Sequence, residues 1–322
     1  MSVKIDNQIK LSDGRAVGYA EYGDPQGKPV LYFHGLPSSR LEGNRPAIDE
    51  IASRLHARII APDRPGIGLS EFKPYTIASW PDIVTEFADK LGLERFAVMG
   101  LSSGGKYVVA CAWKIPQRLT AAGSVSGTCP FDLPGARETL SKQDNQVYGL
   151  ADKAPWLFRL MLWKIARDAR KNPSSIFSLF TEVSEPDKVA LARPDVKQVF
   201  EQMVVESFRQ GTRGAALDWM LEARPWGFSL QGIRMPVYVW HGEADKILSM
   251  EQSRLLAKAV PNARPQFFPN EGHTLIVNHY EELLSARSLS ASGIVITRCQ
   301  APLGDPPQKC GRIKSSAYTG SA

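Results

Sequence analysis

The chain has 322 residues, of which 43% are hydrophobic and 22% charged, so it can bury a large core and does not have the composition of a disordered protein. Half of the formal net charge of +6 comes from residues 289–322, and no basic stripe is interleaved with aromatic residues. We therefore expect no nucleic-acid partner.

The first residues lack the apolar run of a signal peptide, and no uninterrupted apolar stretch reaches the length of about 18 residues that a membrane span needs. These two absences predict a cytoplasmic protein with no membrane partner. The four cysteines are too few and too scattered to suggest a disulfide framework.

The first 130 residues read as alternating strands and helices. Residues before about 28 predict an antiparallel hairpin, with its turn at Ser12, Asp13 and Gly14. Apolar runs at 29–33 and 58–62 predict strands, and each is followed by a glycine-containing loop. The pattern over residues 29–127 is typical of parallel βαβ units.

A helix is predicted to begin after Ser79, which is a plausible N-cap, and to end at Gly92. Its apolar positions form one face at helical spacing, so this helix should pack against the sheet. These positions are Val84, Phe87, Ala88 and Leu91.

The most informative segment follows the next predicted strand, at residues 95–99. There, Gly100 and Gly104 bracket Ser102 in the pattern Gly-x-Ser-x-Gly. A serine held on a sharp strand-to-helix turn needs neighbours without a Cβ atom, and such a turn points its hydroxyl out of the sheet. Ser102, and not Ser103, is therefore the candidate nucleophile.

Another strand is predicted at residues 119–126, and a long helical region rich in aromatic residues follows it, from 131 to 233. Most of its aromatic side chains should pack its own core, and a few should line an apolar pocket. The residues in question are Trp156, Phe158, Trp163, Phe177, Phe180, Phe200, Trp219 and Trp226.

Two further strands, at 236–240 and 266–269, each precede a loop that carries titratable groups. The first loop holds Glu243 and Asp245, and the second holds His273. A serine, an acid and a histidine thus follow three predicted strands in the order Ser, Asp, His. Glu243 lies two residues from Asp245 and could reach the same imidazole, so it remains an alternative to Asp245.

The other four histidines are placed less well for catalysis. His34 and His241 stand at strand ends beside glycines and should shape turns, while His56 and His279 are predicted on helix ends or surfaces. Asp63 and Arg64 should brace their own loop, as should Arg40, for which contact with an anionic substrate is the alternative.

In these segments the chain resembles the α/β-hydrolase superfamily, from about residue 15 to 285. The resemblance implies an α/β fold, with a mostly parallel central sheet, helices on both faces and an inserted helical cap. It makes Ser102 the nucleophile, His273 the general base and Asp245 the residue that orients it. The backbone N–H groups of Leu36 and Ser103 would form the oxyanion hole.

The resemblance also implies the domain boundaries and the reaction. Residues 1–130 and 234–288 would form the catalytic core, and 131–233 the cap. We expect hydrolysis of carboxylic esters of small to medium, fairly apolar substrates through an acyl-enzyme intermediate. A lactonase, a carbon–carbon bond hydrolase and a slow-turnover ligand receptor that retains the triad are the alternatives.

No phosphate-binding loop, dinucleotide fingerprint or metal-ligand spacing is visible, so no cofactor and no metal are expected. The predicted partner is a small-molecule ester or lactone. Residues 289–322 show no sustained periodicity and are rich in Ser, Gly and Pro, which predicts a poorly ordered C-terminal extension that activity does not require.

Overall fold

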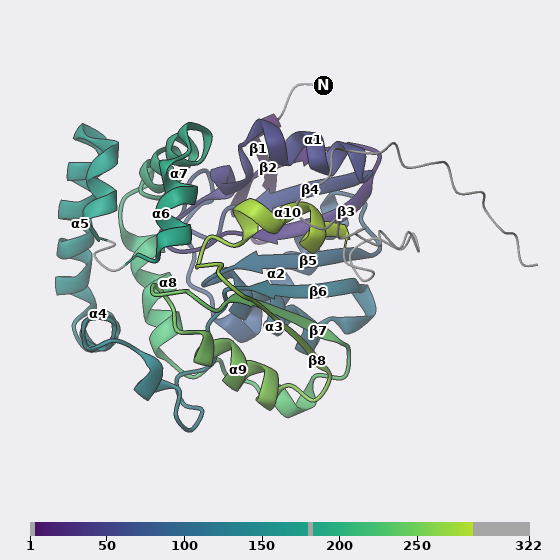
Figure 1. The fold of residues 1–322 in the computed structure, drawn as a ribbon. Helices are drawn as coiled ribbons and strands as arrows, with labels where there is room; N and C mark the ends of the chain where they lie inside the picture. Colours follow the sequence, from purple (N-terminus) through teal and green to yellow (C-terminus); the bar gives the residue numbers. More distant parts are fainter. Residues whose placement is uncertain (1–3, 180–182, 286–322) are drawn as a thin grey trace, which may run out of the picture.

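The strands form one sheet with helices on both of its faces (Figure 1). Within residues 4–179 and 183–285, which the computed structural model describes, the sheet has eight strands in the order β1-β2-β4-β3-β5-β6-β7-β8. β1 and β2 run antiparallel to their neighbours, and the remaining pairs are parallel. The strands are β1 (Lys4–Lys10), β2 (Ala16–Gly23), β3 (Lys28–Phe33), β4 (Ala57–Pro62), β5 (Phe96–Leu101), β6 (Leu119–Val125), β7 (Val237–Gly242) and β8 (Ala263–Phe268).

The central strands are apolar on both faces because helices cover both sides. In β3, Leu31 and Phe33 belong to the hydrophobic cluster under α2 (Trp80–Lys90), α3 (Gly104–Lys114) and α9 (Met250–Ala259). Val30 and Tyr32 belong to a second cluster on the opposite face, under α1 (Pro46–Arg54) and α10 (Ile276–Ser285). The predicted class, a mostly parallel sheet with helices on both faces, is confirmed.

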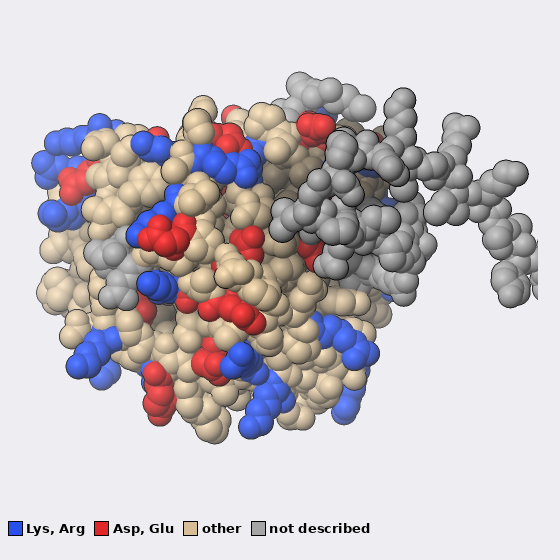
Figure 2. All heavy atoms as spheres, in the orientation of Figure 1, with Lys and Arg blue, Asp and Glu red and all other residues tan. Residues whose placement is uncertain are grey.

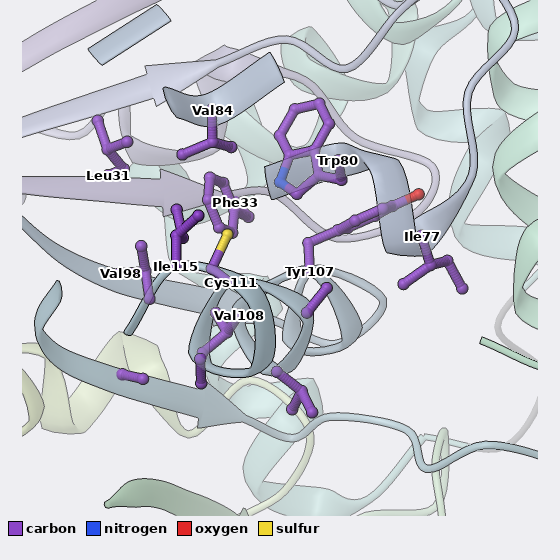
Figure 3. Close-up of a cluster of buried hydrophobic side chains, with 14 of the residues drawn as sticks. Leu31, Phe33, Ile77, Trp80, Val84, Val98, Tyr107, Val108, Cys111 and Ile115 are labelled. Carbon is purple, nitrogen blue, oxygen red and sulfur yellow. The ribbon is translucent and has the colours of Figure 1, made fainter. Parts of the chain in front are cut away.

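The first cluster holds α2 and α3 against the sheet. Figure 3 shows Trp80 of α2 between Phe33 and Tyr107, and the rings of Phe33 and Trp80 meet edge to face with their centroids 5.5 Å apart. The helix predicted after Ser79 is α2, with Val84, Phe87 and Ala88 buried as expected.

The helix begins directly after Ser79 as predicted, but the prediction that Ser79 caps it is wrong. The Ser79 side chain makes no cap hydrogen bond to α2. Instead, Thr76 and Ser79 form a capping box around the short 3-10 helix η2 (Ile77–Ser79), which runs directly into α2. Because Ser79 already bonds back to Thr76, the cap lies three residues earlier than the sequence pattern predicts.

Residues 131–233 lie between β6 and β7 and are helical where they have regular structure, and we refer to them as the helical segment. In Figure 1 its helices stand beyond one end of the strands rather than on a face of the sheet. It contains η4 (Arg137–Thr139), α4 (Lys142–Lys153), α5 (Pro155–Lys171), η5 (Pro173–Leu179), α6 (Glu185–Ala192), α7 (Pro194–Ser207), α8 (Arg213–Ala223) and η6 (Leu230–Gly232). The predicted extension at 289–322 lies outside the described residues, as does Phe180.

The turn between β5 and α3 has the strained geometry that the glycine pattern predicts. Ser102 has a φ of +53°, a left-handed conformation that is uncommon for residues other than glycine. A Cβ atom on Gly100 would lie 2.5 Å from the Gly104 carbonyl oxygen, and one on Gly104 would lie 2.1 Å from the Phe33 carbonyl oxygen. Both glycines are therefore required by close backbone approach.

We expect Gly104→Ala to destabilise the protein by about 2 kcal/mol or more, because its methyl group would collide with backbone that cannot move freely. Gly149→Ala is the matched control. Gly149 lies within α4, and a Cβ atom at this position would have nothing within 4 Å, so alanine should leave stability unchanged or raise it. Urea unfolding of both variants measures the difference, and equal stabilities would contradict this account of the turn.

Candidate active site

His273 and Asp245 are hydrogen-bonded partners at the carboxyl ends of β8 and β7. The Nδ1 atom of His273 lies 2.8 Å from Oδ2 of Asp245. Oδ1 of the same carboxylate accepts hydrogen bonds from the backbone N–H groups of Ile247 and Leu248, so the loop itself orients it. Glu243 is exposed and makes no such contact, so of the two predicted alternatives the structure brings Asp245 to the imidazole.

His241 is a member of this cluster that sequence reasoning assigned only to turn shaping. Its Nε2 atom lies 2.9 Å from Oδ2 of Asp245 and 3.0 Å from the Leu248 carbonyl oxygen, and its Nδ1 atom lies 2.7 Å from the Ser253 hydroxyl. The ring is fully buried. Its position directly before Gly242 carries no signal that its side chain turns toward the Asp245 carboxylate.

The two partners shift each other's pKa in opposite directions. Burial opposes ionisation of Asp245, but the charges and hydrogen bonds of His273 and His241 outweigh burial and lower its pKa well below the usual range. Burial alone would lower the pKa of His273, but the Asp245 carboxylate outweighs it and raises that pKa above the usual value. An imidazole held in this way is a stronger base.

Ser102 and His273 open on the same pocket, a cavity of about 140 Å³ between the strand ends and the helical segment. The Ser102 hydroxyl makes no hydrogen bond within the part of the chain described. In proteins without bound substrate, hydrogen bonds between catalytic groups are often long and tighten on binding. The pocket is lined mainly by apolar side chains, which include Leu36, Leu101, Leu191, Val196, Val199, Phe200, Met203, Ile247, Ile276 and Val277.

The two predicted oxyanion-hole donors are available for a ligand. Among the residues that the structure describes, the backbone N–H groups of Leu36 and Ser103 donate no hydrogen bond, whereas the neighbouring Ser102 N–H donates to the Val125 carbonyl at 2.8 Å. Ser103 directly precedes α3, so its N–H lies at the positive end of a helix. Leu36 lines the same pocket.

A buried carboxylate of the helical segment holds the loop that carries His273. Asp187 of α6 accepts hydrogen bonds from the His273 backbone N–H at 3.0 Å, and from both the backbone N–H and the hydroxyl of Thr274 at 2.7 Å. Its side chain is fully buried. The pattern Ser184-x-x-Asp187 reads as a local helix cap, so nothing in the sequence indicates a partner 86 residues away.

A buried ionic network lies directly beneath the Ser102 turn. Lys106 of α3 contacts both Ser103 and Glu222, and the Ser103 hydroxyl lies 2.7 Å from the Glu222 carboxylate. Thr128 completes the partners of Glu222. The lysine and the glutamate are both fully buried, so removing either would leave the other without its ion-pair partner away from water.

Arg64 forms a second buried pair with the helical segment. Its Nε atom donates to Asp218 of α8 at 2.6 Å, and its terminal nitrogens donate to the carbonyls of His34 and Gly35. Burial opposes the charge on Asp218, but Arg64 and Lys106 outweigh it and lower its pKa to about 2. Arg64 therefore fixes the backbone directly before Leu36, as the expectation of a bracing role requires.

Arg40 is fully engaged and is not presented to the pocket. Its guanidinium binds Asp63 at 2.9 Å and Glu206 of α7 at 2.6 Å, and it also contacts Asp6 and the Ile5 carbonyl. With three carboxylates around one buried cation, the alternative of contact with an anionic substrate loses its basis.

Glu42 is a buried carboxylate in the pocket wall that sequence reasoning missed. It accepts hydrogen bonds from the hydroxyls of Tyr32 and Ser38, both at 2.8 Å, and from the Gly35 N–H. Burial raises its pKa above the usual value despite these bonds. Nothing in the run from Leu36 to Gly43 distinguishes it from a surface glutamate, since its environment is built by residues of β3 and the following loop.

The aromatic residues of the helical segment divide in an unexpected way. Phe158 is buried in the segment's core and Phe200 lines the pocket, as predicted for the group. Trp156 and Trp163 do neither, because their side chains are 71% and 51% exposed.

Among the described residues, no group of three or more His, Cys, Asp or Glu side chains could hold a metal ion.

Comparison with known proteins places this geometry in a family. A family model described as "alpha/beta hydrolase fold" matches residues 28–280. The chain is 26% identical over 275 residues to the 2-hydroxymuconate semialdehyde hydrolase of Pseudomonas putida, covering 83% of this chain and 88% of that protein. It is also 26% identical over 302 residues to Lipase 1 of Psychrobacter immobilis, covering 87% and 82% of the two chains.

Among solved structures, the enol-lactonase from Burkholderia xenovorans LB400 superposes with a TM-score of 0.62 at 18% identity, covering 87% of this chain and 97% of that one. At this identity the likeness concerns the fold alone. The relatives thus share a fold and hydrolytic names but differ in the bond that their names specify.

We expect Asp245→Asn to lower the pKa of His273 below the ordinary value of about 6.5, because burial would then be opposed only by the weaker effects of Asp187 and Glu42. NMR titration of the imidazole resonances measures the shift. Glu243→Gln is the matched control, since this exposed side chain should leave the His273 titration unchanged. A fall in the pKa only in the Glu243 variant would reverse the assignment.

Proposed function

Because this chain belongs to the α/β-hydrolase fold family, we propose that it is a serine hydrolase of carboxylic esters, with Ser102, His273 and Asp245 as its catalytic triad. The observation that carries the proposal is that the strained Ser102 turn and the His273–Asp245 pair open on one apolar pocket. A serine hydroxyl is a weak nucleophile at neutral pH, so it needs a neighbouring base to accept its proton.

In the proposed reaction, Oγ of Ser102 attacks the ester carbonyl carbon while its proton passes to Nε2 of His273. Asp245 holds the other imidazole nitrogen and stabilises the imidazolium. The negative oxygen of the tetrahedral intermediate accepts hydrogen bonds from the Leu36 and Ser103 N–H groups. The intermediate then collapses to an acyl-enzyme, and the alcohol leaves with the proton from His273.

Water completes the cycle by the same route. His273 takes a proton from the water molecule as its oxygen attacks the acyl carbonyl, and returns that proton to Oγ of Ser102 as the acid departs. No cofactor enters either half of this reaction. We propose that the helical segment (residues 131–233) is the cap of a catalytic core formed by 1–130 and 234–288.

The pocket favours a neutral, fairly apolar ester over a substrate that carries a carboxylate. Among the described residues that line it, Arg45 is the one cation, and its guanidinium is bound to Asp195 of α7 at 2.9 Å. Glu42 adds a carboxyl group to the same wall. An anionic group would therefore lose its hydration without gaining an unpaired cation.

We expect Ser102→Ala to lower kcat for p-nitrophenyl esters by at least about 10⁴-fold, because the variant lacks the hydroxyl that forms the acyl-enzyme. Steady-state hydrolysis from the acetate to the decanoate measures this loss, and the chain-length optimum reports the depth of the pocket. Ser178→Ala, at an exposed serine of η5, is the control and should keep wild-type turnover. Turnover that survives in the Ser102 variant would exclude the proposed nucleophile.

We further expect Asp187→Asn to lower kcat by about tenfold, because the loop that carries His273 loses a charged acceptor. The charge of Asp187 also helps to raise the pKa of His273. The base must be neutral to act, so a lower pKa in the variant should move the acidic limb of the pH–rate profile to lower pH.

Asp152→Asn provides the matched control for Asp187→Asn. Asp152 is a surface carboxylate of α4 that pairs with Arg224 and not with the loop of His273. Its variant should keep both the wild-type kcat and the wild-type acidic limb. If the two variants behave alike, the contact between α6 and the His273 loop has no role in catalysis.

A further inference from the structure

Helix α5 presents an apolar stripe to solvent on its outer side. Trp156, Leu160 and Trp163 follow the helical spacing of four and three residues, so they lie in one row along the helix. Their side chains are 71%, 55% and 51% exposed. Figure 1 shows α5 at the outer edge of the helical segment. The opposite face, with Phe158, Leu162 and Ala166, packs into the segment's core.

Basic side chains border this stripe on both sides. At helical spacing, Arg159 and Arg170 fall on one flank of the row and Lys164 and Lys171 on the other. Arg167 continues the row itself, with its guanidinium 5.7 Å from the centre of the Trp163 ring. Figure 2 shows Lys and Arg side chains at the upper part of the edge that α5 forms, with an acidic side chain among them. Against these five cations α5 carries one acidic residue, Asp168, which lies 3.7 Å from Lys164. The Arg170 guanidinium donates a hydrogen bond to the Phe208 carbonyl, so Arg159, Arg167 and Lys171 are the cations without such a partner among the described residues.

We propose that the outer face of α5 binds an anionic lipid surface. A row of Trp and Leu flanked by Lys and Arg is the pattern of a helix that lies in the plane of a membrane interface, with its apolar side among the acyl chains and its cations at the headgroups. The tryptophans suit this depth because their rings are apolar and their indole N–H groups are polar. This inference is independent of the proposed ester hydrolysis.

The charges argue against a second copy of this chain as the occupant. A two-fold contact would place the same face of α5 on both sides of the interface. Arg159 and Lys164 would then lie close to cations of the second copy, and like charges repel each other. An anionic bilayer instead attracts every one of these cations.

From the lack of a long apolar run we expected no membrane partner. No helix in the described ranges is long and apolar enough to cross a bilayer, but binding at an interface needs no spanning segment.

The test is co-sedimentation of the full chain with two kinds of vesicle, one of phosphatidylcholine alone and one of phosphatidylcholine mixed with phosphatidylglycerol. We expect binding to the anionic vesicles only, and binding that weakens as salt is added. Replacing the stripe by Trp156→Ala, Leu160→Ala and Trp163→Ala together should reduce binding by at least about tenfold. Alanine is the best helix former, so these exposed substitutions should leave α5 folded.

Further substitutions test whether vesicle binding depends on α5 and not on charged or apolar residues elsewhere on the surface. Arg159→Gln with Lys164→Gln should weaken binding, whereas Lys90→Gln with Lys258→Gln, at exposed sites on α2 and α9, should not. Val189→Ala, at an exposed apolar residue of α6, should also bind like the wild type. Circular dichroism confirms that each variant is folded.

Three results would overturn the proposal. The first is a wild-type chain that does not sediment with the anionic vesicles. The second is equal binding by the wild type and the stripe variant. The third is a wild-type dimer, detected by light scattering, that the stripe variant converts to a monomer, because the occupant of this face would then be a second copy.

Discussion

The arrangement of this molecule depends on buried ion pairs between the sheet layer and the helical segment. Removing a charge from water costs roughly several kcal/mol per ion, so a buried cation must meet a partner of opposite charge. Arg64 meets Asp218, and Lys106 meets Glu222. Both acids belong to α8, one turn apart, so a shift of this helix along its axis would break both pairs together. The pairs thus set the position of α8 relative to the turn that carries Ser102.

These buried ion pairs and the apolar pocket have separate roles in the site. The loops after β3, β5, β7 and β8 carry the candidate reactive groups, while α6 and α7 contribute apolar wall residues such as Leu191, Val199 and Phe200. A change in those wall side chains would alter the shape of the pocket without touching Ser102 or the His273–Asp245 pair. A fold can carry different chemistries on different sites, and the names of the proteins similar to this chain specify different bonds.

The sequence predicted the groups whose signal is local. Apolar runs identified the strands, and Gly100 and Gly104 identified the turn because close backbone approach at both positions leaves no space for a Cβ atom. Asp245 and His273 were predictable since each directly follows a strand of a parallel sheet, and the carboxyl ends of such strands meet at one edge.

Residues whose role depends on distant partners were not predictable. Asp187 reads as part of a helix cap, and its bonds to the His273 loop arise only when α6 lies against the loop that follows β8. Helical periodicity in α5 identifies two faces, but it does not say which of them a neighbour covers. Trp156 and Trp163 were therefore expected to be buried, but their side chains are exposed.

The side chain of Arg40 affects how the protein unfolds, because it links three regions of the chain. It joins the N-terminal strand through Ile5 and Asp6, the loop after β4 through Asp63, and α7 through Glu206. Opening any one of these three regions would take a partner from the guanidinium and leave the carboxylate of that region without Arg40. The helical segment and the sheet should therefore lose their structure in one cooperative transition rather than as two separately melting units.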